Sequence, residues 1–243
     1  MKILITGASS GLGAEFARQY ASKENELFLL ARRKERLVAL KNELQESCKA
    51  ITLLCVDVIA FEELQEQMKK LPDIDMVILN AGISIGHSNA VPTIAEFQRL
   101  YDVNVLANHA ILEILLPKMR AKRSGKVVFI SSLASLFSMP SSKVYSSSKR
   151  ALNAYAEGVR YKYAPHGIKV ITILPGFIKS ELTDKNEFTM PFFMGTREGV
   201  TRMKRAIDAG KEFYAFPLRF YLIIRFFNLL PSALSQRIVN YLS

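Results

Sequence analysis

The chain has 243 residues, 49% of them hydrophobic, and a formal net charge of +11 from 33 basic and 22 acidic residues. This length and apolar content suit one α/β domain with a large core. The basic excess is not accompanied by a nucleic-acid-binding module, so nucleic acid is excluded as the expected partner. Attraction to an anionic membrane surface remains as a second interpretation of the charge.

The cysteines and histidines do not indicate a metal site. Cys48 and Cys55 have a spacing that fits no zinc motif, and both fall in or beside a buried-looking strand. They are therefore expected to be buried free thiols in a reducing cytoplasm. The histidines are scattered at His87, His109 and His166. No metal is expected, and the first predicted strand begins too early to leave a signal peptide.

Short apolar runs alternate with helical patterns along the whole chain. Strands are predicted at 2–5, 27–31, 51–57, 76–80, 126–131, 169–174 and 212–216. Helices are predicted at 14–21, 34–47, 61–70, 94–119, 144–163 and 196–209. Repeated β-α alternation predicts a doubly wound, seven-stranded parallel sheet with helices on both faces. No linker or repeat divides the chain, so residues 1–243 are expected to form one domain.

A glycine-rich segment, residues 6–13, lies between the first predicted strand and the first predicted helix. A strand, a glycine turn and a helix are the context that a dinucleotide-binding loop requires. The glycines permit close backbone approach, and the helix N-terminus offers N–H groups to a pyrophosphate. The spacing G-x-x-x-G-x-G is one residue longer in its first gap than the usual pattern. The expected cofactor contacts here are Gly7, Ser9, Ser10, Gly11, Leu12 and Gly13.

Tyr145 and Lys149 are predicted to lie one turn apart on the same face of a helix. A phenol titrates near pH 10 in water, so a tyrosine alone is a poor acid or base at neutrality. An ammonium one turn away is expected to lower that pKa. A tyrosine tuned in this way suits proton transfer to or from an alcohol oxygen. The pair alone is a weak signal, because helices carry such pairs by chance.

Together with five further motifs, these segments resemble the short-chain dehydrogenase/reductase family over essentially the full chain. The seven motifs stand in the family's order: residues 6–13, Asp57-Val58, Asn80-Ala81-Gly82, Asn104, Ser131-Ser132, Tyr145 with Lys149, and Pro175-Gly176. The resemblance implies a Rossmann-like fold. It also implies an NAD(P)-dependent oxidoreductase that moves a hydride between nicotinamide and a carbonyl or secondary alcohol.

The resemblance implies four catalytic residues. Tyr145 would deliver a proton to the substrate oxygen, and Ser132 would orient that oxygen. Lys149 would lower the tyrosine pKa and bond the nicotinamide ribose, while Asn104 would hold a water in a proton relay. Ser132 is preferred over Ser131 because it stands 13 residues before Tyr145, the separation found in the family.

Further cofactor contacts follow from the same resemblance. Asp57, with Val58, would lie near the adenine amino group, although an Asp at a strand end is otherwise a turn former. The contacts expected at the ribose and nicotinamide are Asn80, Ala81, Gly82, Pro175, Gly176, Ile178 and Ser180. The family usually has N-N-A-G, and here Leu79 replaces the first Asn. Ser180 stands where the family often has Thr.

The residues after the second predicted strand indicate which dinucleotide is preferred. Chains that prefer NAD tend to place there an acid that bonds the ribose 2′-OH, whereas this chain has Ala31-Arg32-Arg33. An arginine can pair with a 2′-phosphate, and Ser9 can add a hydroxyl contact. Cations are poorly placed at a helix N-terminus, which favours a ligand role over a solvated helix start. NADP(H) is therefore expected over NAD(H), with Arg32 as the first candidate and Arg33 as the second.

The C-terminal third is expected to bind the substrate. A substrate lid is predicted at about 181–210, and its Met190–Met194 patch suits an irregular hydrophobic ligand, with core packing as the alternative. The apolar segment at about 216–243 is too short and too charged to span a membrane. It is interpreted as a subunit interface, an interfacial membrane contact or a wall of the substrate pocket.

The expected protein is thus a cytoplasmic reductase, or one in peripheral contact with a membrane, that acts on a small hydrophobic ketone or aldehyde as a homodimer or homotetramer. One alternative is a non-catalytic NADP(H)-binding sensor on the same scaffold, but such proteins typically lose the tyrosine or the lysine. The other alternative is a membrane-surface lipid-handling protein in which the apolar C-terminal segment is the main functional feature.

Overall fold

The computed structural model of the protein describes residues 1–85, 90–184 and 189–242. Three expectations fall partly outside the described residues. These are the scattered histidine His87, residues 185–188 of the predicted lid, and residue 243 at the end of the apolar C-terminal segment.

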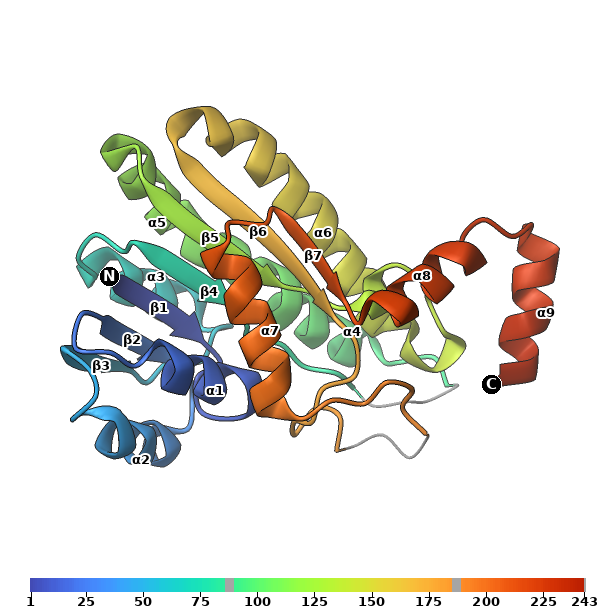
Figure 1. Cartoon of the computed structure of the whole chain (residues 1–243), viewed down its shortest axis with the longest axis horizontal. Helices are drawn as coiled ribbons and strands as arrows, with labels where there is room; N and C mark the ends of the chain where they lie inside the picture. The colour runs from blue at the N-terminus through green and yellow to red at the C-terminus, as the bar shows by residue number, and fades with distance from the viewer. Residues whose placement is uncertain (86–89, 185–188, 243) are drawn as a thin grey trace.

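The described strands form one seven-stranded sheet in the order β3-β2-β1-β4-β5-β6-β7 (Figure 1). Every pair of neighbouring strands is parallel. The strands are Lys2–Thr6 (β1), Glu26–Leu30 (β2), Ala50–Leu54 (β3), Met76–Leu79 (β4), Gly125–Ile130 (β5), Ile168–Pro175 (β6) and Phe213–Phe216 (β7). The predicted doubly wound, Rossmann-like sheet is confirmed.

The described helices alternate with these strands and then continue beyond the last one. They are Gly11–Tyr20 (α1), Lys34–Leu44 (α2), Phe61–Lys70 (α3), Ile94–Tyr101 (α4), Ala107–Lys122 (α5), Lys143–Tyr163 (α6), Thr196–Asp208 (α7), Leu218–Phe227 (α8) and Ser232–Leu242 (α9). The prediction for 61–70 is confirmed to the residue. The predicted helix at 94–119 is helical throughout, but a π-helical turn at Asp102–Leu106 interrupts the α-helical geometry between α4 and α5.

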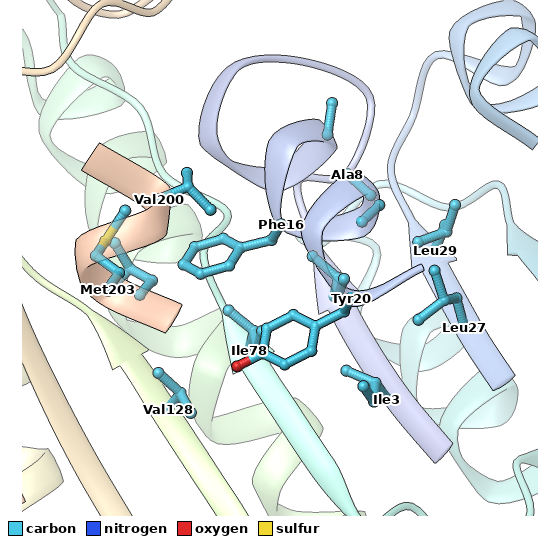
Figure 2. Packing of buried hydrophobic residues seen from close by; sticks show 14 of the residues in the cluster. Ile3, Ala8, Phe16, Tyr20, Leu27, Leu29, Ile78, Val128, Val200 and Met203 are labelled. Carbon is cyan, nitrogen blue, oxygen red and sulfur yellow. The ribbon is translucent and has the colours of Figure 1, made fainter. Parts of the chain in front are cut away.

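The two faces of the sheet are covered by different helices. Side chains alternate along a strand, so Ile3 joins one hydrophobic cluster and Leu4 joins the other. On the first face α1 and α7 lie side by side, and Figure 2 shows Phe16 of α1 beside Met203 of α7 above the strand residue Ile78. Helices α3, α5 and α6 contribute to the cluster on the second face. Burial on both faces explains why the strands are continuously apolar.

The structure at the end of the third strand corrects two predictions, one on the position of Asp57 and one on the burial of Cys55. Strand β3 ends at Leu54, so Asp57 lies in the turn after the strand and not at its last residue. Cys48 is buried as expected, but Cys55, just beyond β3, is exposed. Because β3 is the outermost strand of the sheet, its C-terminal end has no covering neighbour on one side.

The C-terminal helices extend the molecule beyond the sheet. Helix α8 packs through Ile224 against Leu133 and Leu174, and α9 lies beyond it, away from the sheet (Figure 1). Across the described ranges, none of the helices is both long enough and apolar enough to cross a membrane. The expected lid at 181–210 includes α7, whose Val200 and Ile207 are fully buried against the sheet. Only 181–195 is therefore retained as a proposed lid.

The strand order reverses beside the carboxyl ends of β1 and β4, where a ligand-binding crevice is expected. From β1 the chain builds outward to β2 and β3, and then returns to add β4 on the other side of β1. Ligands of open α/β sheets bind outside the carboxyl ends of the strands at such a reversal. The segments that follow β1 and β4 are residues 7–10 and 80–82, which the sequence had already marked.

Candidate active site

The glycine-rich loop is fastened to the end of β4 through Thr6. Its hydroxyl oxygen accepts hydrogen bonds from the backbone N–H groups of Asn80 and Ala81, each at 2.9 Å. The Asn80 side chain donates to the Thr6 carbonyl at 3.0 Å. Gly7 has a φ of 68°, which favours glycine, and a Cβ at Gly13 would collide with the Gly7 carbonyl. The loop can therefore pack tightly only because these positions are glycines.

The remaining predicted loop residues lie where the loop enters α1. Ser10 is the residue before α1, which begins at Gly11. Leu12 packs its side chain against the first hydrophobic cluster, so its contact with a cofactor is restricted to the backbone. No acidic residue occupies the first turn of α1. The positive end of this helix is thus available to an anion.

Arg33, and not Arg32, contacts the glycine-rich loop. The Arg33 guanidinium donates from Nε to Ser9 Oγ at 3.2 Å and from a terminal nitrogen to Ser10 Oγ at 2.6 Å. Arg32 instead pairs with Asp57, with 3.3 Å between guanidinium nitrogen and carboxylate oxygen. Arg33 is therefore better placed than Arg32 to bind a phosphate, which is the reverse of the predicted order.

The predicted adenine contact at Asp57-Val58 has partners within the protein. Asp57 also accepts a hydrogen bond from the Ile59 N–H at 3.3 Å, as in a local turn. The Val58 side chain is buried in the second hydrophobic cluster. Asp57 remains at the surface of this turn, whereas Val58 can reach a ligand only through its backbone.

Glu181 is a charged site residue that the sequence did not reveal. Its carboxylate accepts a bond from Arg33 at 3.1 Å and another from Ser10 Oγ at 3.1 Å. A second Arg33 nitrogen lies 2.9 Å from the other carboxylate oxygen, and Arg36 of α2 also pairs with Glu181. These hydrogen bonds lower the pKa of Glu181 to about 2. Arg33 lies 148 residues away in the chain, so no local pattern could predict the contact.

Tyr145 lies at a small pocket at the start of α6. The pocket has a volume of about 140 Å³, and Tyr145 shares its lining with the apolar residues Ile85, Val91, Pro92 and Val144. Burial raises the pKa of the Tyr145 phenol to about 12, and a hydrogen bond with Ser132 acts in the opposite direction. The expectation that Lys149 lowers this pKa is wrong for the protein alone, because desolvation dominates. The lining residues Ile85 and 90–92 lie outside the described helices and strands and gave no signal in the sequence.

Lys149 is buried behind Tyr145, with 4% of its surface exposed. Its Nζ donates to the Ile130 carbonyl at the end of β5, at 3.0 Å, and lies 5.8 Å from the Tyr145 ring centre. Burial lowers the pKa of the amine to about 8. A Cβ placed on Gly82 would lie 3.3 Å from Lys149 Nζ. The glycine after β4 thus leaves space directly next to the amine.

The two adjacent serines after β5 have different partners. Ser131 is buried and donates to the Lys149 carbonyl at 3.3 Å, which fastens α6 to the sheet. Ser132 accepts a bond from the Ala134 N–H at 3.1 Å and hydrogen-bonds Tyr145. Ser132 is therefore the serine that the structure brings to the tyrosine.

Asn104 lies in the π-helical turn and is completely buried. Its side-chain oxygen accepts from the Ile83 N–H at 2.9 Å, and its amide donates to the Ile83 carbonyl at 3.1 Å and to Ser148 Oγ at 3.0 Å. The Asn104 carbonyl accepts a bond from the Asn108 side chain at 2.8 Å. These bonds compensate for an asparagine inside a helix. They also join the segment after β4 to α6.

The four residues predicted near the nicotinamide follow β6 in order. Pro175 ends the strand, and the Gly176 N–H donates to the Phe216 carbonyl at 2.8 Å. Ile178 is buried in the first cluster. The Ser180 N–H donates to Thr183 Oγ1 at 2.8 Å, and a Cβ on Gly11 would lie 3.3 Å from Ser180 Cβ. This segment therefore returns to the glycine-rich loop.

Known proteins are similar to this chain in sequence and in architecture. The sequence profile of the family described as short chain dehydrogenase matches residues 1–190. An uncharacterized oxidoreductase from Myxococcus xanthus is 35% identical over 95% of this chain and 93% of its own length. The 3-oxoacyl-[acyl-carrier-protein] reductase FabG of Rickettsia prowazekii is 31% identical over 75% of this chain and 74% of its own. A solved short-chain dehydrogenase from Sphingobium yanoikuyae, in complex with NADPH, is 26% identical with a TM-score of 0.84, covering 89% of this chain and 88% of its own.

Proposed function

The chain belongs to the short-chain dehydrogenase family and is an NAD(P)-dependent oxidoreductase, and from this premise we propose that it reduces a hydrophobic ketone or aldehyde with NADP(H). One observation carries the proposal. The phenol of Tyr145 lies at a pocket lined by both apolar and polar residues, hydrogen-bonds Ser132 and has the Lys149 amine behind it. The presence of both Tyr145 and Lys149 gives no support to a non-catalytic sensor.

The residues of the crevice fit an NADP(H) molecule. A Cβ at Gly13 would collide with the Gly7 carbonyl, so this glycine permits the close packing of helix and strand that a dinucleotide-binding loop requires. Arg33 and the hydroxyl of Ser10 already hold an anion, the carboxylate of Glu181, which stands in for a phosphate. The relative from Sphingobium yanoikuyae was solved with NADPH, which supports the same cofactor here.

The reaction is assigned to the residues around Tyr145. When bound, the nicotinamide supplies a hydride to the carbonyl carbon. Tyr145 is protonated at neutral pH, since its pKa is about 12, and so has a proton to donate to the carbonyl oxygen. Ser132 orients the same oxygen. The nearby Lys149 ammonium favours the phenolate that Tyr145 then becomes. The water relay through Asn104 stays a prediction.

An apolar substrate suits the surroundings of the pocket. Ile85, Val91 and Pro92 line it on one side, and Val91 is 88% exposed at its rim. Phe192, from the proposed lid at 181–195, packs against Phe220 of α8, with 5.7 Å between ring centres. These side chains offer apolar area to the substrate. Glu96 and Lys143 also line the pocket, but Glu96 is bonded to Thr93 and Lys143 to the Ala90 and Pro140 carbonyls. A ketone or aldehyde with an extended hydrocarbon part is therefore the proposed substrate class.

Replacing the proposed acid tests the reaction. Tyr145→Phe should lower turnover by about a thousandfold or more, because the variant lacks the hydroxyl group that donates the proton and then becomes a phenolate. Dissociation constants for NADPH should change by no more than about twofold. The assay is NADPH consumption over a panel of ketones and aldehydes of graded chain length. Tyr161→Phe, which alters an exposed tyrosine of the same helix, is the control. Retained turnover in Tyr145→Phe would refute the mechanism.

Replacing each arginine tests the cofactor preference. Arg33→Met should weaken NADPH binding about tenfold to a hundredfold, because it removes charge-assisted bonds to the 2′-phosphate. NADH binding should be little affected. Arg32→Met, whose arginine pairs with Asp57, is the matched control and should change the dissociation constant for NADPH by less than about threefold. Fluorescence titration gives all the constants. Equal affinity of the wild type for NADH and NADPH would contradict the preference.

The outer face of α8 supports contact with an anionic membrane surface. Helix α8 packs inward through Ile224, whereas Leu218, Leu222 and Phe226 are 64%, 55% and 60% exposed. These three residues follow one another at four-residue intervals and so share one face. Residues 213–243 contain three arginines and no acidic residue. An apolar face with cationic flanks suits the headgroup region of a bilayer, whereas a second copy would bring the same positive charge. A homodimer or homotetramer stays a prediction.

A further inference from the structure

Glu181 is bound as an external anion would be. Two nitrogens of Arg33 approach its two carboxylate oxygens, at 3.1 Å and 2.9 Å. Ser10 Oγ donates to it at 3.1 Å, and Arg36 supplies a second guanidinium. A paired guanidinium and a hydroxyl are the groups that recognise a phosphate monoester. The protein thus fills its own anion-binding cluster with a side chain.

The backbone beside Glu181 also lies against the glycine-rich loop. A Cβ on Gly11, the first residue of α1, would lie 3.3 Å from Ser180 Cβ. Because α1 has no acidic residue in its first turn, the Glu181 carboxylate is the negative charge supplied to the Ser10 N-cap. The carboxylate therefore stands in the crevice at the point where the loop and the second strand's arginine meet.

A short turn holds Glu181 in this position. The Thr183 hydroxyl donates to the Ile178 carbonyl at 2.9 Å, and the Ser180 N–H donates back to Thr183 Oγ1 at 2.8 Å. The neighbouring Ile178 is anchored in the core against α7. Glu181 is therefore carried by the same turn as Ser180, which is one of the proposed nicotinamide contacts.

We propose that Glu181 sets the affinity of this protein for NADP(H) by occupying the 2′-phosphate site in the free state. The carboxylate has to release Arg33 and Ser10 before the phosphate binds. The observed association constant is then the intrinsic constant multiplied by the fraction of molecules in which Glu181 is already released. This inference rests on the proposed preference for NADP(H). It assigns to Glu181 a role in discriminating between cofactors, since a ligand without the 2′-phosphate does not compete for Arg33.

The test uses two fragments of the cofactor and isothermal titration calorimetry on the full chain. The fragments are 2′,5′-ADP and 5′-AMP, which differ in the 2′-phosphate. Glu181→Gln removes the charge of a half-exposed side chain and keeps its shape. The variant should bind 2′,5′-ADP about threefold to tenfold more tightly than the wild type, as expected for the loss of surface ion pairs. Its affinity for 5′-AMP should change by less than about twofold.

The control is Glu198→Gln, which removes an equally exposed carboxylate that pairs with Arg202 on α7. This control should bind both fragments like the wild type. If the wild type prefers 2′,5′-ADP but Glu181→Gln binds it equally or more weakly, the role of Glu181 is overturned while the cofactor preference stands. If neither the wild type nor Glu181→Gln distinguishes the fragments, the preference for NADP(H) fails as well. Equal tightening for both fragments would show general charge repulsion and would also overturn the proposal.

Discussion

The ammonium group of Lys149 is held in the interior of the protein, next to Tyr145. Its hydrogen bond to the Ile130 carbonyl does not offset the loss of water, so the pKa of the amine falls to about 8. The pKa in an unfolded chain is near 10.5. Between these two values the unfolded chain binds more protons than the folded protein, so stability rises with pH across this window. The protein therefore carries an unfavourable buried charge at neutral pH.

This charge predicts how Lys149→Met alters the pH dependence of stability. Between pH 7 and pH 10 the wild type should gain, relative to the variant, on the order of 2 kcal/mol in its free energy of unfolding. Tyr145 does not interfere, because its pKa is raised to about 12 and its effect begins only above pH 10. Urea unfolding of both proteins at several pH values measures the difference. Parallel curves over this range would show that Lys149 is not desolvated.

Individual site residues differ in how far the sequence could identify them. Tyr145 and Ser132 were predicted from motif spacing, and the structure brings them into hydrogen-bond contact. Arg33 was predicted second to Arg32, because a motif cannot tell which of two adjacent arginines turns toward Ser9. Glu181 had no signal at all, since its partners come from the glycine-rich loop and α2.

The π-helical turn at Asp102–Leu106 shows the same limit for an element of structure. The hydrophobic pattern of 94–119 fits one helix and correctly locates both α4 and most of α5. In the widened turn the Asn104 side chain bonds Ile83, which lies 21 residues away in the chain. Such turns often occur at functional sites. Here the turn fixes the segment after β4 next to α6.

Helix α8 gives a prediction for membrane binding. Sedimentation with vesicles of mixed phosphatidylcholine and phosphatidylglycerol should recover the wild type, increasingly so at higher anionic lipid content. The double variant Leu222→Glu with Phe226→Glu should bind at least about tenfold more weakly, because burial of two large apolar side chains is lost. Turnover of a water-soluble substrate should stay within about twofold.

The control for this experiment is Lys70→Glu at the end of α3, which changes the net charge by the same amount on another helix of the protein. It should retain most of the vesicle binding. Two results would contradict the membrane proposal. The wild type could stay in the supernatant at every lipid composition, or light scattering could show a wild-type oligomer that the double variant dissociates. The second result would make this face of α8 a subunit interface.

The architecture of the whole molecule was predictable because the same alternation of short apolar runs and helical patterns is repeated along the chain. Each buried strand is a short apolar run, and each crossover is a longer helical pattern, so alternation alone predicts a parallel sheet. The positions of strand ends were less accurate. β3 was expected to reach Asp57 but ends at Leu54. The prediction ran too far because Val56 and Val58 continue the apolar pattern into a turn, where both side chains pack into the core as those of a strand do. The C-terminal helices lie outside the alternation, and the packing of α8 on Leu133 and Leu174 has no counterpart in the local sequence.

The Thr6 hydroxyl has a consequence for how the molecule folds. It joins β1 to backbone groups 74 and 75 residues later in the chain, whereas the pairing of β1 with β2 needs only the first helical crossover. Closing the longer loop costs more chain entropy, and contacts of high sequence separation slow folding. During synthesis the crevice cannot form until β4 has emerged, even though the glycine-rich loop is among the first residues made. The glycine-rich loop is therefore synthesised first, and about a third of the chain has to be made before the site that it belongs to can form.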